Sequence, residues 1–85
     1  MFKGYVRDNK ELTKPETNGQ VVLDDAIFCC GPEQLRAIAQ FLTIAAGWLE
    51  EPLARATDWH AHARLEVQGW DNLFPNEDVI VCLPE

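Results

Sequence analysis

The sequence predicts an α+β fold: a two-layer sandwich of order β-β-α-β-β, with one long helix packed on an antiparallel or mixed sheet of about four strands. Three observations predict it. A long apolar segment has helical periodicity, a nine-residue segment alternates between apolar and polar residues, and three shorter segments are rich in strand-forming residues. With 85 residues, 47% of them apolar, the chain is expected to form a single domain, 1–85, with one modest core.

The N-terminal part, residues 1–19, is predicted to contain a short edge strand at 2–6 followed by a polar loop. That loop ends in Asn18-Gly19, a dipeptide that favours a hairpin because both residues tolerate positive φ. We therefore expect the first strand to form a hairpin with the start of the β-α-β-β core, which spans 20–85.

Residues 20–30 are predicted to form the second strand. β-Branched and aromatic residues dominate both of its ends, and Asp24-Asp25 interrupts the pattern, so a bulge or bend is expected there. The last five residues, 26–30, are apolar on both faces, which is typical of a central strand.

The helix is predicted from its start signal and its end. Gly31 can serve as the N-cap, and Pro32 is preorganised for the first helical position. The helix is expected to run to about Glu50 or Glu51, because Pro52 cannot continue it without cost.

This helix has two apolar stripes, although one is enough to pack on a sheet. The first comprises Leu35, Ile38, Ala39, Leu42, Ala45, Ala46 and Leu49, and the second comprises Ala37, Phe41, Ile44 and Trp48. Something else must then cover the second stripe: the chain's own segment 52–59, a second copy of the protein, or a different partner. The sequence thus predicts an oligomer interface at Phe41, Ile44 and Trp48.

Strict alternation over residues 60–68 predicts a half-buried antiparallel strand. Its core-facing residues would be Ala61, Ala63, Leu65 and Val67, and its outward residues would be His60, His62, Arg64, Glu66 and Gln68. A turn-rich link at 69–76 and a last strand at 78–83 follow.

The three cysteines, Cys29, Cys30 and Cys82, lie in apolar stretches and form no disulfide pattern. They are interpreted as small buried hydrophobes in a reducing cytosol. No secretory leader precedes the first charged residues, and the longest apolar run is shorter than the roughly 20 residues that span a bilayer. A soluble, cytoplasmic protein is expected.

The net charge of −7 excludes nucleic acids and anionic membranes as natural partners, because both attract Lys and Arg. The charge is unevenly spread: residues 1–14 carry +2 and residues 15–85 carry −9. This distribution suits a basic protein partner, although solubility alone is the simpler interpretation.

Little in the sequence indicates catalysis, and no cofactor is predicted. The chain has no serine, and its paired acids are adjacent, so they point in different directions. His60 and His62 are weak metal candidates: on a strand they would share a face about 7 Å apart, yet nothing fixes a third ligand. The same strand face is instead predicted to bind a protein partner, through His60, His62, Arg64, Glu66 and Trp59.

One resemblance adds to this interpretation. The helix block Gly31-Pro32-Glu33, Leu35, Ile38-Ala39, Phe41-Leu42 and Ala45, followed by His60-x-His62 and Asp78-Val79-Ile80-Val81, resembles a small bacterial α+β family of predicted polymorphic-toxin immunity proteins, immunity protein family thirty-two. The resemblance covers about residues 20–84. It implies a cytosolic protein that binds and neutralises a cognate toxin and catalyses nothing.

Two alternatives to an immunity-type inhibitor stay open at this point. One is a structural homodimer of unknown role, paired through the second helix stripe. The other is a metal-dependent enzyme centred on His60 and His62.

Overall fold

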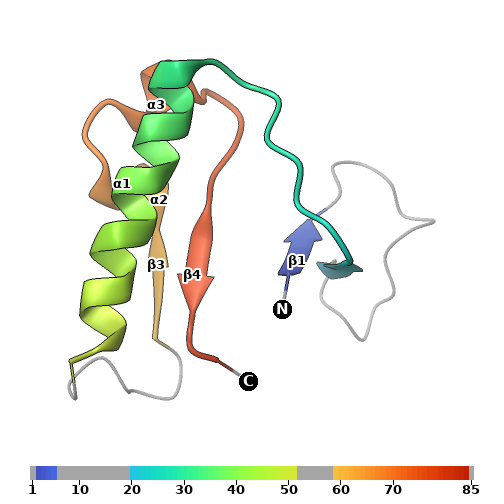
Figure 1. Cartoon of the computed structure of the whole chain (residues 1–85), viewed down its shortest axis with the longest axis vertical. Helices are drawn as coiled ribbons and strands as arrows, with labels where there is room; N and C mark the ends of the chain where they lie inside the picture. Colours follow the sequence, from blue (N-terminus) through green and yellow to red (C-terminus); the bar gives the residue numbers. More distant parts are fainter. Residues whose placement is uncertain (1, 6–19, 52–58, 85) are drawn as a thin grey trace.

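The computed structural model describes residues 2–5, 20–51 and 59–84. It is an α+β fold with one long helix, two short helices and four short strands in these residues (Figure 1). The elements in chain order are β1 (Phe2–Tyr5), β2 (Gln20–Leu23), α1 (Pro32–Leu49), β3 (His60–His62), α2 (Ala63–Glu66), α3 (Trp70–Leu73) and β4 (Ile80–Cys82). The polar loop and the connection expected at 52–58 lie outside the described residues.

Helix α1 confirms the prediction, with Gly31 as its N-cap and Pro32 in its first turn. The side chain of Gln34 adds a contact at this end, because its Oε1 accepts a hydrogen bond from the Gly31 N–H at 2.8 Å. This is the half of a capping box that does not need an N-cap side chain. The helix ends one residue before Glu50, which is its C-cap.

The expected N-terminal hairpin is present. Strands β1 and β2 pair antiparallel, with Phe2 opposite Leu23 and Tyr5 opposite Gln20. The chain bends at Asp24, as the two adjacent acids suggested.

The central strand predicted for residues 26–30 is wrong for this structure. Residues 25–30, which we call the strap, connect the hairpin to α1 and form neither strand nor helix. They make no hydrogen bond within the described part of the chain. Ile27 and Phe28 are exposed, because no neighbouring strand pairs with this segment.

The alternating segment 60–68 forms a strand only as far as His62, which corrects the nine-residue strand. The N–H of Ala63 still donates to the Val79 carbonyl at 2.8 Å, as the β3–β4 register requires. The chain then turns into α2, where the Asp78 carboxylate accepts the next N–H, that of Arg64. Ala61, Ala63 and Val67 are buried as predicted, whereas Leu65 on the short helix is 76% exposed.

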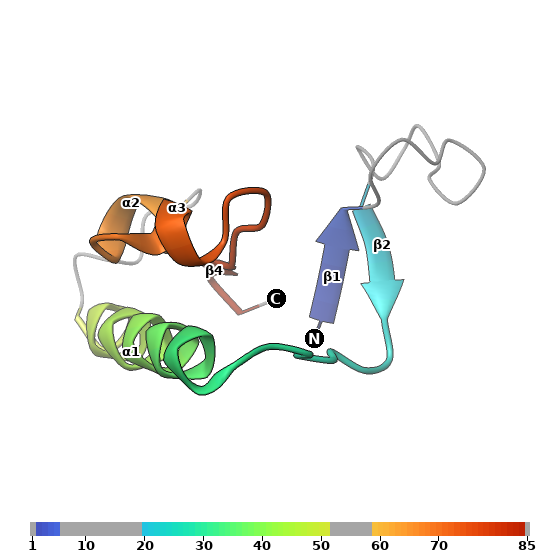
Figure 2. The same cartoon turned by 90° about the horizontal axis from the view of Figure 1, so that it is seen from above.

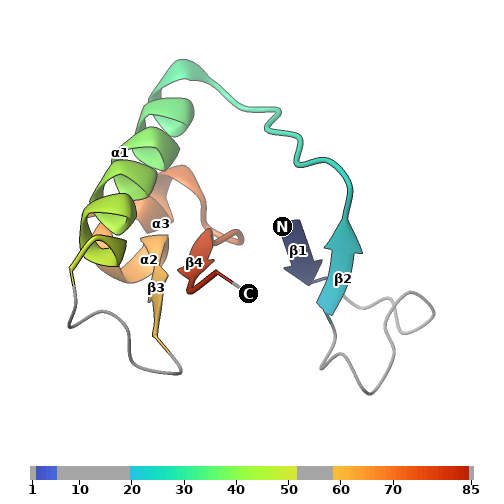
Figure 3. The same ribbon diagram turned by 60° about the horizontal axis from the view of Figure 1, so that its bottom comes forward.

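The strands form two separate two-stranded antiparallel sheets in the described residues, β1-β2 and β3-β4. This differs from the single sheet of about four strands, since the strap does not pair and β3 is short. The views in Figures 1 and 3 show the hairpin standing apart from the layer formed by β3 and β4.

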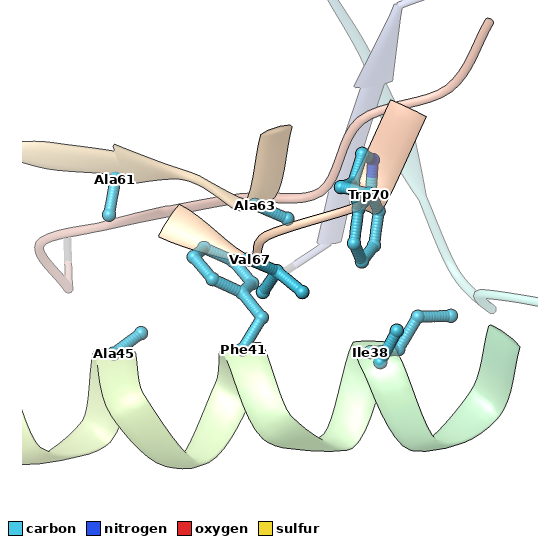
Figure 4. Close-up of a cluster of buried hydrophobic side chains, with 8 residues drawn as sticks. Ile38, Phe41, Ala45, Ala61, Ala63, Val67 and Trp70 are labelled. Carbon is cyan, nitrogen blue, oxygen red and sulfur yellow. The ribbon is translucent and has the colours of Figure 1, made fainter. Parts of the chain in front are cut away.

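The core lies between α1 and a second layer made of β3, α2, α3 and β4 (Figure 2). Its buried members are Ala37, Ile38, Phe41, Ala45, Ala61, Ala63, Val67 and Trp70. Phe41 points from α1 toward Val67 and Ala63, and Trp70 stands over the Ile38 end of the helix (Figure 4). The two large rings, Phe41 and Trp70, are almost completely buried and are the largest side chains of the core.

This packing uses both helix stripes: Ile38 and Ala45 of the first stripe are buried together with Ala37 and Phe41 of the second. Phe41, predicted at an oligomer interface, is fully buried inside one chain, and Ile44 and Trp48 are half-buried. Leu35 and Leu42 of the other stripe are 44% and 45% exposed. The second layer therefore packs along the line between the two stripes, with Phe41 at its centre, because burying this ring removes a large apolar area from water.

The cysteines also differ from the prediction. Cys29 and Cys82 are exposed and Cys30 is half-buried, and all three are free thiols. Their burial was predicted from strands packed on both faces, and those strands are short or absent here. Among the described residues, no helix is long and apolar enough to cross a membrane.

Alanine substitutions on the buried and the exposed side of α1 should destabilise the fold to different extents. Phe41→Ala removes a fully buried ring and should lower the free energy of unfolding by about 3–5 kcal/mol. Leu42→Ala, at a position 45% exposed, should cost less than about 1.5 kcal/mol. Urea unfolding followed by tryptophan fluorescence measures both. Equal losses would contradict the burial described here.

Candidate protein-binding face

Strands β3 and β4 position the two histidines. His60 lies opposite Cys82, Ala61 opposite Val81, and His62 opposite Ile80. Ala61 is buried toward α1, and successive side chains of a strand point to opposite faces, so His60 and His62 lie on the face away from the core. Their rings meet edge to face, with centroids 5.1 Å apart.

Asp78, just before β4, organises this face. Its Oδ2 lies 2.8 Å from Nδ1 of His62. Its Oδ1 accepts two backbone hydrogen bonds, from the N–H of Arg64 at 3.0 Å and from the N–H of Val79 at 2.9 Å. The carboxylate thereby caps the start of α2 from a distant part of the chain, where the helix dipole favours a negative charge.

These contacts change the acidity of Asp78. Burial by itself raises the pKa of this carboxyl, but the hydrogen bonds from the Arg64 backbone, from His62 and from the Val79 backbone, with the charge of His62, outweigh it. The pKa of Asp78 is therefore lowered below its ordinary value of 3.8. The group is an anion at neutral pH.

An anionic Asp78 also sets the orientation of His62. A carboxylate only accepts hydrogen bonds, so Nδ1 of His62 is the donor in this pair. The ring is then fixed with Nε2 on the side away from Asp78. His62 is half-exposed, so that atom is placed to meet a partner.

The other residues predicted for this face are split by the turn into α2. Arg64 and Glu66 are both exposed, but they project from the short helix and not from the strand. Arg64 Nε pairs with Asp71 Oδ1 at 3.3 Å, and both side chains are well exposed, so this ion pair contributes little to stability.

Trp59 lies at the other end of the predicted face and is half-buried. Its ring packs edge to face on Trp48 of α1, with centroids 6.5 Å apart. Trp59 belongs to segment 52–59, one of the three covers considered for the second stripe, and its ring covers part of Trp48. The structure thus brings His60 and His62 together and places Trp59, Arg64 and Glu66 around them.

Sequence reasoning missed three residues that hold this region together. Asp78 was treated as part of an acidic pair, Gln34 was taken only as part of the helix start, and Trp70 was placed in a turn-rich link. Trp70 is buried, and its ring stacks on that of Phe74 with centroids 4.6 Å apart. Its Nε1 donates a hydrogen bond to the Glu77 carbonyl at 2.9 Å. Gln34 donates from Nε2 to the Leu73 carbonyl, which joins α1 to α3.

A usable signal existed for one of them. Gly31 and Gln34 are spaced like the two ends of a capping box, which predicts the Gln34 contact with the Gly31 N–H. The contacts of Asp78 join positions 14 and 16 residues apart, and local patterns do not encode such pairs.

The metal hypothesis gains no third ligand from the geometry. Within residues 2–5, 20–51 and 59–84, no group of three or more His, Cys, Asp or Glu side chains is arranged to hold a metal ion. Asp78 is the acid that contacts the histidine pair. Its carboxylate already accepts hydrogen bonds from His62 and from two backbone N–H groups.

No family model, curated protein or solved structure matches the chain significantly. The function is therefore argued from the residues and their geometry.

Removing the Asp78 carboxylate should destabilise the fold more than removing an exposed one. Asp78→Ala leaves the N–H groups of Arg64 and Val79 without their acceptor, which should cost about 1–3 kcal/mol. Asp71→Ala breaks only the exposed ion pair to Arg64 and should cost less than about 1 kcal/mol. Chemical denaturation of both variants at pH 7 makes the comparison. A loss at Asp71 as large as that at Asp78 would refute the capping role.

The Asp78 carboxylate should also make the free energy of unfolding decrease at acidic pH. Because folding lowers its pKa, Asp78 stabilises the protein above pH 3.8, and this contribution falls as the pH drops through 3.8 toward the lowered value. The stability difference between the wild type and Asp78→Asn should therefore be largest near pH 7 and shrink below pH 4. Urea unfolding of the two proteins from pH 7 to pH 3 tests this. A difference that does not change with pH would contradict it.

Proposed function

We propose that the chain is a non-enzymatic, cytosolic binding protein, an immunity-type inhibitor that neutralises a basic toxin domain through an acidic surface. The observation that carries the proposal is the state of its acidic side chains. Eight described acids are exposed: Asp24, Asp25, Glu33, Glu50, Glu51, Glu66, Asp71 and Glu77. Of these eight, Asp71 is the one with an ion pair in the described part of the chain.

Carboxylates without cationic partners create a negative potential that extends beyond the molecular surface. Such a field raises the rate at which a basic protein associates and disfavours acidic competitors. The described bases, Lys3, Arg36 and Arg64, are too few to neutralise it. The charge therefore supports a basic protein as the partner.

The face around His60 and His62 supplies the directional contacts that charge alone does not. Asp78 fixes the His62 ring, so this side chain loses little further freedom when it binds. The exposed Arg64 and Glu66 beside it can pair with groups of either sign, and Trp59 adds a half-buried aromatic surface. We propose that this histidine face is the centre of the interface and the exposed acids its rim.

A fold with a small core is compatible with this role. Eight large apolar side chains are exposed in the described residues, and half of the eight core residues are alanine. Two of the eight, Ile27 and Phe28, are adjacent in the strap, and exposed apolar side chains that lie together are typical of interaction surfaces. It supports binding as the activity in preference to catalysis.

The test begins with the gene next to this one, where an immunity protein's toxin is expected to be encoded. Co-production with that toxin domain should restore growth of the host, and the purified proteins should bind with an association rate that falls steeply as salt is raised. The absence of a toxin-like neighbour, or of protection by the wild-type protein, would overturn the proposal.

Charge reversals then locate the surface. Glu66→Lys beside the histidines should weaken binding at least tenfold, or about 1.4 kcal/mol. Lys3→Glu, on the distant hairpin, is a charge reversal in the opposite sense, and it should not weaken binding to a basic partner. His60→Ala should weaken binding without changing its salt dependence, since it removes a contact and no carboxylate. Normal binding by both Glu66→Lys and His60→Ala would place the interface elsewhere.

A further inference from the structure

The strap has strand-forming residues and an unpaired backbone, as the edge of a sheet does. It forms neither strand nor helix, it makes no hydrogen bond in the described part of the chain, and its residues 26–30 carry no charge. Ile27 is 81% exposed and Phe28 is 53% exposed. Soluble proteins normally protect such edges with a charged residue, a proline, a bulge or a covering segment, because an exposed apolar edge recruits another strand.

We propose that a second copy of this chain covers the strap, by antiparallel pairing of the two straps about a two-fold axis. Antiparallel pairing of identical segments is self-complementary, so each copy gives and receives the same contacts and the assembly closes as a dimer. Residues 26–30 have the β-branched and aromatic composition of a strand, which is why the sequence predicted a central strand there. The pairing supplies the neighbour that such a strand lacks in one chain.

The charges at the two ends of the strap favour antiparallel over parallel pairing with a second copy. With Ile27 opposite Phe28 of the second copy, antiparallel pairing places Asp24 opposite the second copy's Gly31, the N-cap of α1. Gly31 offers no side-chain acceptor to the first turn of that helix, whose positive end favours a carboxylate. Parallel pairing in register would instead place the Asp24-Asp25 pairs of the two copies side by side, where they repel.

The surroundings of the strap fit an apolar neighbour. Ile27 and Phe28 line a hollow of about 380 Å³ together with Trp70, Phe74 and Val79. The side chains of a second strap would cover its open side. Glu77 and Asp78 also line this hollow, so its far side adjoins the histidine face, whereas His60 and His62 are not among its lining residues.

Sedimentation over a wide range of protein concentration provides the test. The wild type should be dimeric at high concentration, and Ile27→Lys should raise the dimer dissociation constant at least tenfold. Leu65→Lys is the matched control, since Leu65 is 76% exposed on α2 and should leave the dimer intact. Both positions are exposed, so neither lysine should alter unfolding of the monomer. A wild type that stays monomeric near 1 mM, or a dimer that Ile27→Lys does not weaken, would overturn the proposal.

Cross-linking checks the register. The proposed pairing places Ala26 opposite Cys29 of the second copy, a geometry that brings their Cβ atoms within about 4.5–5.5 Å. With Cys30 and Cys82 replaced by alanine, Ala26→Cys should form a covalent dimer on mild oxidation, whereas the same protein with Ala26 retained should not. A dimeric protein that forms no cross-link in the Ala26→Cys variant would overturn antiparallel strap pairing.

Discussion

One carboxylate joins the segments on which the second layer depends. Asp78 contacts the last residue of β3, the first turn of α2 and its own neighbour at the start of β4. Without it, nothing in the described chain would accept the Arg64 N–H, and a continued strand would compete with the turn. The constraint on that backbone therefore decides where β3 ends, which side chains share a face with His60 and His62, and where Arg64 and Glu66 project.

Local patterns in the sequence were enough for the long helix and the hairpin. Gly31, Pro32 and Pro52 mark the ends of α1, and Asn18-Gly19 indicated the pairing of β1 with β2. They were not enough for the sheet. The alternation of residues 60–68 is the same whether Leu65 faces a core or solvent, and the deciding contact comes from Asp78, beyond the segment itself.

The helix faces illustrate a second limit. Two apolar stripes around one helix predict that both are covered, but they do not say that the second layer packs along the line between them. Phe41, Ile44 and Trp48 were predicted at an interface because one stripe is enough to pack on a sheet. The structure buries Phe41 because it meets Val67, and it half-buries Trp48 because it meets Trp59. Of the candidate site, the sequence identified the two histidines, while the group that orients His62 came only from the structure.

The bonds of the second layer have a consequence for the order of folding. Trp70 to Glu77 spans 7 residues and His62 to Asp78 spans 16, whereas Gln34 to Leu73, which joins the two layers, spans 39. Short loops close at a smaller entropic cost than long ones, so contacts of low sequence separation form first. We expect residues 59–84 to organise around Trp70 before α1 docks on them. The N-terminal hairpin, which pairs Tyr5 with Gln20 and Phe2 with Leu23, also has local contacts, so we expect it to form separately from that core.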